Sequence, residues 1–500
     1  MQESPPTPVS ARAIYLLLGV AILRLWVMRL DSSFWLDETG TYWVVKDGWG
    51  QLFARIHEWP NIATPLYLIV AAAAHSIGGT AEWVMRLPSL LAVAAAALLV
   101  HRLAVRLLGP ESALPALALF VCADSVMFAA ADARPYGLLL LGTAASTLAL
   151  VEWLETNSTR SLILYVLAAG FALHTQYLAI PLLLGHAAYA WARIREGSPV
   201  RLTHLLTAAA GVGLLWLPLA PLFWTIFSAR ANLSWTPAPT LPELAASLTP
   251  SVPIFAAALG LLVAWQTSSP LNAKARPVPS STAILLTVSA LLPPLVMFAS
   301  STLTSNHIFA ARYFIEAQVF LALLGGWAIG RLEPTGARMT VTAAILVFSL
   351  AASGSWSQWM PNHDNEDWRD ALAAVREVTD GTRIPILAQC GFVESSTPGF
   401  DFGGSIPAYL TSPFDLYPTG GAVIPMPSRL DEGSALYLNS QVVPILEQND
   451  RFVFVNRVGL TQDATLRWME HRLPGYDAER LGSFGRVTTL LFRRSNSPAR

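Results

Sequence analysis

The chain has 500 residues, of which 13% are charged and 53% are hydrophobic, whereas about 25% of residues are charged in an ordinary soluble domain. This composition, with a mean hydropathy of +0.46, excludes a single soluble globular domain and predicts several membrane-spanning helices. The formal net charge of -1 and the lack of a strongly basic patch argue against nucleic acid as a partner. The two cysteines, Cys122 and Cys390, lack the spacing of a disulfide framework or a zinc site.

The N-terminal segment is predicted to be retained as a membrane span. Residues 1–10 are polar and Pro-rich and lack the basic region and cleavage site of a signal peptide, so residues 11–30 are expected to form the first helix. Similar apolar segments recur along the chain and indicate about eleven spans in all. They lie at 11–30, 84–107, 112–131, 136–154, 161–175, 177–194, 202–228, 251–267, 281–304, 313–330 and 338–356.

The segment 64–78 decides the topology of everything that follows it. Its length of about 15 residues is short for a span, and we expect it to lie along the membrane surface. With a cytoplasmic N-terminus and this segment not crossing, every predicted inner loop carries basic residues, as the positive-inside rule requires. These residues are Arg102, Arg106, Arg160, Arg193, Arg195, Arg201, Lys274, Arg276, Arg331 and Arg338. The loop 31–83 then lies outside the cytoplasm, after the first span, and the odd number of spans places the C-terminal part outside as well.

The part of the chain after residue 361 has the composition of a soluble domain and no spanning run. A cluster of prolines with Gly420-Gly421 predicts a long loop within it. Periodicity predicts helices at 367–378 and 464–472 and strands at 384–388, 451–456 and 486–492. The expected fold is an α-helical polytopic membrane protein with a C-terminal extramembrane α/β domain. Its expected parts are a transmembrane module at 1–360, with a large first outward loop at 31–83, and an extracytoplasmic α/β domain at 361–500.

Two adjacent carboxylates, Asp37 and Glu38, follow the first predicted span and lie among aromatic residues. Carboxylates at the boundary of the hydrocarbon region are costly unless they are solvated, paired or functional. A solvated start of the loop, with Glu38 as a helix cap, is the structural alternative. The pair alone does not decide between structure and function.

Three further polar clusters are predicted at the same outward face. A structural Asp–Arg ion pair is the alternative for the first cluster, and a structural histidine at a helix end is the alternative for the others. Four clusters at one membrane face instead predict a common functional site, because ionisable residues at membrane depth are functional candidates. The three clusters are Asp132-Ala133-Arg134-Pro135-Tyr136, His174-Thr175-Gln176-Tyr177, and His307 with Arg312-Tyr313.

The order of these motifs resembles that of the GT-C glycosyltransferases, in particular the protein O-mannosyltransferases and the bacterial aminoarabinose-type lipid A transferases. The resemblance covers most of the chain. It departs from the family at Thr64, which replaces the first proline of a Pro-Pro-type segment and is not preceded by lysine. The matching motifs are Trp35-Leu36-Asp37-Glu38, Thr64-Pro65-Leu66-Tyr67, Arg86-Leu87-Pro88-Ser89, Asp132-Ala133-Arg134-Pro135-Tyr136, Arg312-Tyr313 and Asp367-Trp368-Arg369.

The resemblance implies a polyprenyl-phosphate sugar donor and inversion at the anomeric carbon. The acceptor hydroxyl needs a base, and we expect Asp37 to be that base. Arg312 and Arg134 are expected to bind the phosphate that leaves. Asp132 is expected either to orient the acceptor or a metal, or to hold Arg134. The remaining predicted substrate-binding residues are Glu38, Tyr67, Tyr136, His174, His307 and Tyr313.

Some relatives in this family bind a divalent cation, and Asp37, Glu38 and Asp132 are the oxygen ligands that this chain would offer to Mg or Mn. The expected partners are the lipid-linked donor, membrane lipids around its prenyl chain, and a glycan, lipid or protein acceptor. The expected location is a bacterial inner membrane, with the site and the C-terminal domain facing outward. Three alternatives stay open, namely a lipid or sugar transporter or flippase, a receptor with an outer ligand-binding domain, and a non-catalytic member of the same fold.

Overall fold

The computed structural model describes residues 11–58, 64–228, 237–249, 251–267, 272–273, 277–305, 307–353, 362–379, 383–396, 406–457 and 462–495. The chain divides into two compact units. Unit 1 consists of Met1–Leu30, Ala63–Ala74 and Trp83–Pro361, and unit 2 of Asp31–Ile62, His75–Glu82 and Asn362–Arg500. Most of the first outward loop therefore groups with the C-terminal part of the chain.

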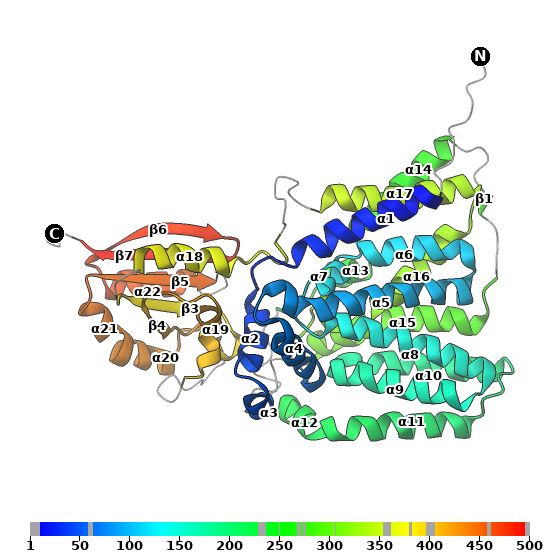
Figure 1. The fold of residues 1–500 in the computed structure, drawn as a ribbon, viewed down its shortest axis with the longest axis horizontal. Helices are drawn as coiled ribbons and strands as arrows, with labels where there is room; N and C mark the ends of the chain where they lie inside the picture. Colours follow the sequence, from blue (N-terminus) through cyan, green and yellow to red (C-terminus); the bar gives the residue numbers. More distant parts are fainter. Residues whose placement is uncertain are drawn as a thin grey trace, which may run out of the picture. The chain divides into compact units, whose positions relative to one another are not determined.

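Unit 1 is built almost entirely of helices (Figure 1). A short antiparallel pair, β1 (Asn272–Ala273) with β2 (Leu332–Glu333), joins two of its loops. Its helices are α1 (Ala11–Leu25), η1 (Val27–Arg29), α4 (Pro65–Gly78, shared with unit 2), α5 (Glu82–Leu108), η2 (Pro110–Ser112), α6 (Ala113–Cys122), α7 (Asp124–Ala130), α8 (Tyr136–Thr156), α9 (Thr159–Thr175), η3 (Tyr177–Ala179), α10 (Ile180–Arg195), α11 (Leu202–Trp216), η4 (Leu217–Leu219), α12 (Ala220–Ser228), α13 (Leu241–Leu248), α14 (Ser251–Thr267), α15 (Ser280–Leu303), η6 (Ala311–Phe314), α16 (Ala317–Gly330) and α17 (Thr335–Ala352).

The helices of unit 1 confirm a multi-pass membrane protein. Among the described residues, 6 helices are long and apolar enough to cross a membrane, and 2 bent pairs pass the same test together. Each apolar segment predicted from the sequence contains a helix. The segment predicted as one span at 112–131 is broken, because the backbone is extended at Ala123 and α6 meets α7 at 67°. Lys274 and Arg276, from one predicted inner loop, lie outside the described residues.

Small residues bring the helices of unit 1 into close contact. A Cβ atom added at Gly326 of α16 would lie 2.5 Å from the Cβ atom of Ala116 on α6. One added at Gly137 of α8 would lie 2.9 Å from the backbone oxygen of Ser89 on α5. In a membrane the hydrophobic effect does not drive helices together, because lipid tails are as apolar as the side chains. Close backbone approach of this kind is therefore a main source of helix association there.

Unit 2 contains a five-stranded sheet with the order β4-β3-β5-β7-β6. Strand β3 is parallel to β4 and β5, whereas β7 is antiparallel to β5 and β6. The strands are β3 (Pro385–Gln389), β4 (Ala422–Pro425), β5 (Arg451–Arg457), β6 (Tyr476–Phe484) and β7 (Val487–Arg494). The helices are α2 (Leu36–Val45), α3 (Trp49–Glu58), α18 (Trp368–Thr379), η7 (Val393–Ser396), η8 (Ala408–Thr411), α19 (Ser412–Leu416), α20 (Glu432–Tyr437), η9 (Leu438–Val442), α21 (Val443–Glu447) and α22 (Gln462–Arg472).

The sheet core explains which strands the sequence predicts. Strands β3, β5 and β7 were predicted, and they carry the buried apolar residues, with Phe452, Phe454 and Phe492 in one cluster. Strand β6 was not predicted, because it lies at the edge of the sheet and most of its residues are exposed. The long loop predicted around Gly420-Gly421 is wrong in part, because β4 forms there as the other edge strand and ends at Pro425.

Candidate functional site

The two carboxylates of the first loop lie in the first turn of α2 and have different surroundings. Glu38 is fully buried, and its Oε2 atom accepts a hydrogen bond of 3.2 Å from the backbone N–H of Trp35, the residue that precedes the helix. Asp37 is half-buried. A carboxylate in the first turn is favoured by the helix dipole. Glu38 therefore caps the helix, as the structural alternative proposed, and Asp37 is the more exposed acid of the pair.

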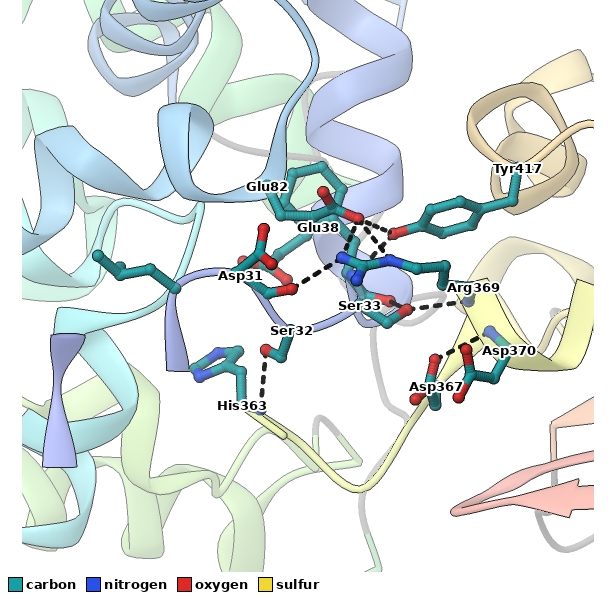
Figure 2. Close-up of polar contacts among 12 residues, drawn as sticks. Asp31, Ser32, Ser33, Glu38, Glu82, His363, Asp367, Arg369, Asp370 and Tyr417 are labelled. Atoms are coloured by element: carbon teal, nitrogen blue, oxygen red, sulfur yellow. Dashed lines mark hydrogen bonds and ion pairs between the residues drawn. The ribbon is translucent and has the colours of Figure 1, made fainter. Parts of the chain in front are cut away.

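The segment that leads into α2 is held by residues of the C-terminal part (Figure 2). The Arg369 guanidinium donates to the backbone oxygen of Asp31 at 2.8 Å and to Glu82 Oε1 at 2.5 Å. The Tyr417 hydroxyl donates to the same Glu82 oxygen at 2.8 Å and accepts from the backbone N–H of Phe34 at 3.1 Å. Burial and the nearby Glu82 carboxylate raise the pKa of Tyr417, so Tyr417 stays protonated and can donate.

A third carboxylate lies near Asp37 within unit 2. Burial raises the pKa of Glu394, a hydrogen bond with Tyr409 opposes that rise, and the charge of Asp37 adds to it. The Tyr409 ring contacts Trp43 of α2, with ring centroids 5.8 Å apart, and Phe392, with centroids 5.2 Å apart. The sequence offers no motif around Glu394, so its neighbourhood with Asp37 comes from the tertiary structure.

A histidine that was not predicted accompanies Glu38. One ligand atom of the Glu38 carboxylate and one imidazole nitrogen of His363 lie within 4.8 Å of one another, and both side chains are buried. The backbone N–H of His363 donates to Ser32 Oγ at 3.0 Å, which holds the two segments together. Unit 2 thus combines a carboxylate and an imidazole at one point, whereas Asp132, the third predicted metal ligand, belongs to unit 1.

In unit 1, the Arg86 motif fixes two backbone segments that flank predicted site residues. Arg86 is fully buried, and its Nη1 atom donates to the backbone oxygens of Arg29 at 3.2 Å and Leu30 at 2.9 Å. Ser89 Oγ donates to the backbone oxygen of Arg134 at 3.2 Å. The motif therefore holds the end of the first span and the turn that carries Arg134.

Asp132 and Arg134 lie in the turn between α7 and α8, and Tyr136 begins α8. The exposed fractions of their side chains are 0%, 9% and 1%, so all three lie inside unit 1. Tyr136 is the first residue of α8, and Pro135 precedes it. These side chains are placed by the helix end and by the Ser89 contact rather than by a solvent-exposed loop.

The predicted residues on later segments of unit 1 fall into one connected region. His174 Nε2 makes a hydrogen bond of 2.8 Å with the backbone oxygen of Leu215. Thr64 Oγ1 donates to the backbone oxygen of Thr175 at 2.8 Å, which joins α4, with its buried Tyr67, to the end of α9. Directly after α9, η3 packs against η6, the segment that contains Arg312 and Tyr313.

Within η6, the Arg312 guanidinium lies 5.4 Å from the centre of the Tyr313 ring. His307, shortly before η6, is half-buried. Glu316 was not predicted as a site residue although it interrupts an apolar stretch four positions after Arg312. It is fully buried, and neither of its carboxylate oxygens has a hydrogen-bond partner among the described residues. An acid in such a place is a functional candidate.

Comparisons with known proteins agree with this architecture. Residues 63–224 match the family described as dolichyl-phosphate-mannose-protein mannosyltransferase. No curated protein sequence matches the chain. ArnT from Cupriavidus metallidurans in the apo state is similar in structure, with a TM-score of 0.54, 12% identity, and coverage of 96% of this chain and 98% of that one.

ArnT from the same organism bound to undecaprenyl phosphate gives a TM-score of 0.54 at 12% identity and covers 97% of this chain and 98% of that one. The mycobacterial arabinofuranosyltransferase AftD gives 0.49 at 14% identity and covers 99% of this chain and 41% of that one. The match to the mannosyltransferase family and the ArnT-like fold of the whole chain confirm the resemblance drawn from the motifs. The chain is thus similar to GT-C membrane glycosyltransferases, in sequence over residues 63–224 and in fold over its whole length.

Proposed function

We propose that the chain transfers a sugar from a polyprenyl-phosphate donor to the hydroxyl of an extracytoplasmic acceptor, with inversion and with Asp37 as the general base. Asp37 is chosen as the base because the two acids in the first turn of α2 have different surroundings. Glu38 is buried and caps the helix through Trp35, whereas Asp37, at the preceding position of the same turn, is half-buried. The undecaprenyl phosphate bound to ArnT, a protein of similar fold, supports a polyprenyl lipid as the donor.

In the proposed step, the acceptor oxygen attacks the anomeric carbon as its proton passes to the Asp37 carboxylate. The bond between the anomeric carbon and the phosphate oxygen breaks, and its electron pair stays on the polyprenyl phosphate. Arg312 and Arg134 are proposed to stabilise that growing negative charge, because a guanidinium binds phosphate through two parallel hydrogen bonds. The donor would be bound and oriented by Tyr67, Tyr136, His174, His307 and Tyr313.

The experiment is a transfer assay in membranes with radiolabelled polyprenyl-phosphate sugars and the endogenous acceptors. The native protein is compared with Asp37→Asn and with Asp47→Asn, which alters another acid of the same loop. We expect one donor to be consumed, Asp37→Asn to lose at least about 100-fold in rate, and Asp47→Asn to stay within about 3-fold. Full activity of Asp37→Asn would refute the assignment of the base. Failure of every donor would favour the transporter or receptor alternatives.

A divalent cation at the first-loop carboxylates is a separate expectation. A cation bound by the Glu38 carboxylate would have the His363 imidazole close by, since one ligand atom of each lies within 4.8 Å of the other. A mixed carboxylate and imidazole set suits Mn better than Mg. Treatment with a chelator is therefore expected to lower the transfer rate, and Mn is expected to restore it better than Mg. An unchanged rate after chelation would remove the metal from the proposal.

The proposed location is the inner membrane of a bacterium, with the Asp37 loop and the C-terminal domain facing outward. It rests on the positive residues of the predicted inner loops and on the number of spans predicted from the sequence. Labelling of single cysteines introduced at exposed positions, such as Glu58 and Glu479, by a reagent that cannot cross the membrane tests this orientation. Labelling of both positions in intact spheroplasts is the expected result.

A further inference from the structure

The start of α2 depends on an acid that lies 330 residues away in the chain. Glu366 Oε2 accepts a hydrogen bond of 3.1 Å from the backbone N–H of Leu36, the first residue of the helix. Glu366 is 1% exposed, so this contact is shielded from water. The first N–H groups of a helix have no partner within the helix and need an acceptor from elsewhere. The Glu38 carboxylate accepts from the N–H of Trp35, and the Glu366 carboxylate accepts from the N–H of the next residue, Leu36.

Glu366 is itself held rigidly. Its Oε2 atom also accepts from Trp368 Nε1 at 3.2 Å, and its Oε1 atom accepts from Arg457 Nε of β5 at 2.5 Å. On either side of it, the Asp367 N–H donates to the backbone oxygen of Phe484 at 3.2 Å, and the Arg486 N–H donates to that of Asn365 at 2.7 Å. The carboxylate that receives Leu36 is therefore fixed by the sheet of unit 2.

Residues around Glu366 continue the same contact along the segment before α2 (Figure 2). The backbone N–H of His363 donates to Ser32 Oγ at 3.0 Å, and that of Arg369 donates to Ser33 Oγ at 3.1 Å. The short stretch 363–369 thus binds the stretch 31–36 at three successive places. Asp37 is the residue that directly follows the last of them.

We infer that Glu366 is a positioning residue for the transfer reaction, and that it sets the place of Asp37 by capping the first turn of α2. This inference rests on the proposed function of Asp37. It gives the C-terminal domain a part in the reaction, because the acceptor of the Leu36 N–H belongs to that domain. An error of about 1 Å in the place of a catalytic group can cost about 100-fold in rate, so the contact should affect turnover rather than donor binding.

The first test compares Glu366→Ala and Glu366→Gln with Glu479→Ala, which removes an acid from an exposed ion pair on β6 of the same unit. Glu366→Ala is expected to lower kcat at least about 10-fold, with KM for the donor changed less than about 3-fold. Glu366→Gln is expected to retain more activity, because its amide oxygen can still accept from Leu36. Equal kcat in Glu366→Ala and Glu479→Ala, or equal losses in Ala and Gln, would overturn the inference.

A second test removes the donor and leaves Glu366 unchanged. Proline is tolerated at the first position of a helix but has no N–H, and the extended backbone of Trp35 suits a following proline. Leu36→Pro and Leu36→Ala both lose the leucine side chain, and the proline variant alone loses the hydrogen bond to Glu366. A lower kcat for Leu36→Pro than for Leu36→Ala supports the inference, and equal values contradict it.

Hydrogen exchange separates this inference from the proposed function. In Glu366→Ala, backbone amides of residues 34–38 should exchange at least about 10-fold faster, since the capping acceptor is lost, whereas β5 stays protected. If the native protein transfers no sugar, the proposed function fails, and this measurement alone decides whether Glu366 positions the segment. Unchanged exchange at 34–38 with β5 protected would overturn the positioning role. Should Glu366→Ala not fold, the same comparison is made between the two Leu36 variants.

Discussion

The two units use polar side chains in different ways. In unit 1, buried polar groups such as Arg86 and Ser89 each bind backbone oxygens at a helix end, and the helices meet through small residues such as Gly326. In unit 2, acids and their partners form a continuous set of contacts that runs from Glu82 to Glu366 along one segment. Helices in lipid satisfy their own backbone groups, whereas an irregular segment must obtain its partners from other parts of the chain. We therefore expect the stability of unit 1 to depend on single hydrogen bonds at helix ends and on the volume of packed residues. The stability of unit 2 is expected to depend on the geometry of its carboxylates.

The largest effect on unit 1 is expected for Arg86→Ala. The substitution removes the donor to the backbone oxygens of buried Leu30 and half-buried Arg29, and the expected loss of stability is about 3 kcal/mol. Arg86→Lys should restore part of it. Arg102→Ala is the control, because Arg102 is 63% exposed and pairs with Glu152 at the surface. Thermal unfolding of the purified protein in detergent measures all three. A loss no greater than that of Arg102→Ala would contradict the capping role of Arg86.

The next largest effect is expected for Gly326→Ala. The new Cβ atom would lie 2.5 Å from Ala116 Cβ and 2.8 Å from its backbone nitrogen, and a backbone cannot give way like the end of a long side chain. We expect a loss of about 2 kcal/mol from overpacking. Gly19→Ala on α1 is the matched control, since a Cβ added there meets no atom of the described residues within 4 Å. Equal unfolding temperatures for the two variants would contradict the claim that the stability of unit 1 depends on the space between closely packed helices.

A smaller effect, specific to unit 2, concerns pH. Burial raises the pKa of Glu366 above its ordinary value, against the opposing charge of Arg457. The folded protein therefore binds this proton more tightly than the unfolded chain does. The resulting stability is complete below the ordinary pKa and is lost as the pH rises through the raised pKa. The slope from this group is at most about 1.4 kcal/mol per pH unit.

Glu366→Gln cannot titrate, so its unfolding temperature should fall less steeply with pH over that interval than that of the native protein. The exposed Glu432→Gln serves as the comparison and should keep the native slope. The measurement is the unfolding temperature between about pH 4 and pH 8 at a constant scan rate. If the unfolding temperature of Glu366→Gln falls with pH as steeply as that of the native protein, Glu366 does not bind its proton more tightly in the folded protein than in the unfolded chain.

Much of the membrane part could be predicted because its signals are local. The length and hydropathy of each apolar segment are enough to indicate a helix, and helices occur at all the predicted places. The bend at Ala123 was not predicted, because one extended residue inside an apolar stretch leaves no mark on hydropathy. In the C-terminal part, β6 was missed because its exposed edge position requires few apolar residues.

The candidate site was predicted in part. Sequence order indicated Asp37, Asp132, Arg134 and Arg312 as members of one family pattern, and the family match, at residues 63–224, includes Asp132 and Arg134 but not the other two. Their chemical roles stay predictions. Glu316 could have been found from the sequence as an acid within an apolar stretch. Glu394 could not, because its relation to Asp37 exists only once η7 and α2 share unit 2.

The sequence by itself determined that this protein is a multi-pass membrane protein with a C-terminal α/β domain and a conspicuous acid pair after its first span. Those properties depend on composition and on short-range periodicity, which each segment carries alone. The tertiary structure alone decided that Glu38 caps its helix while Asp37 stays half-buried, and that Glu366 supplies the next acceptor. A contact between residues 330 positions apart leaves no periodic pattern, because it depends on how two distant segments pack.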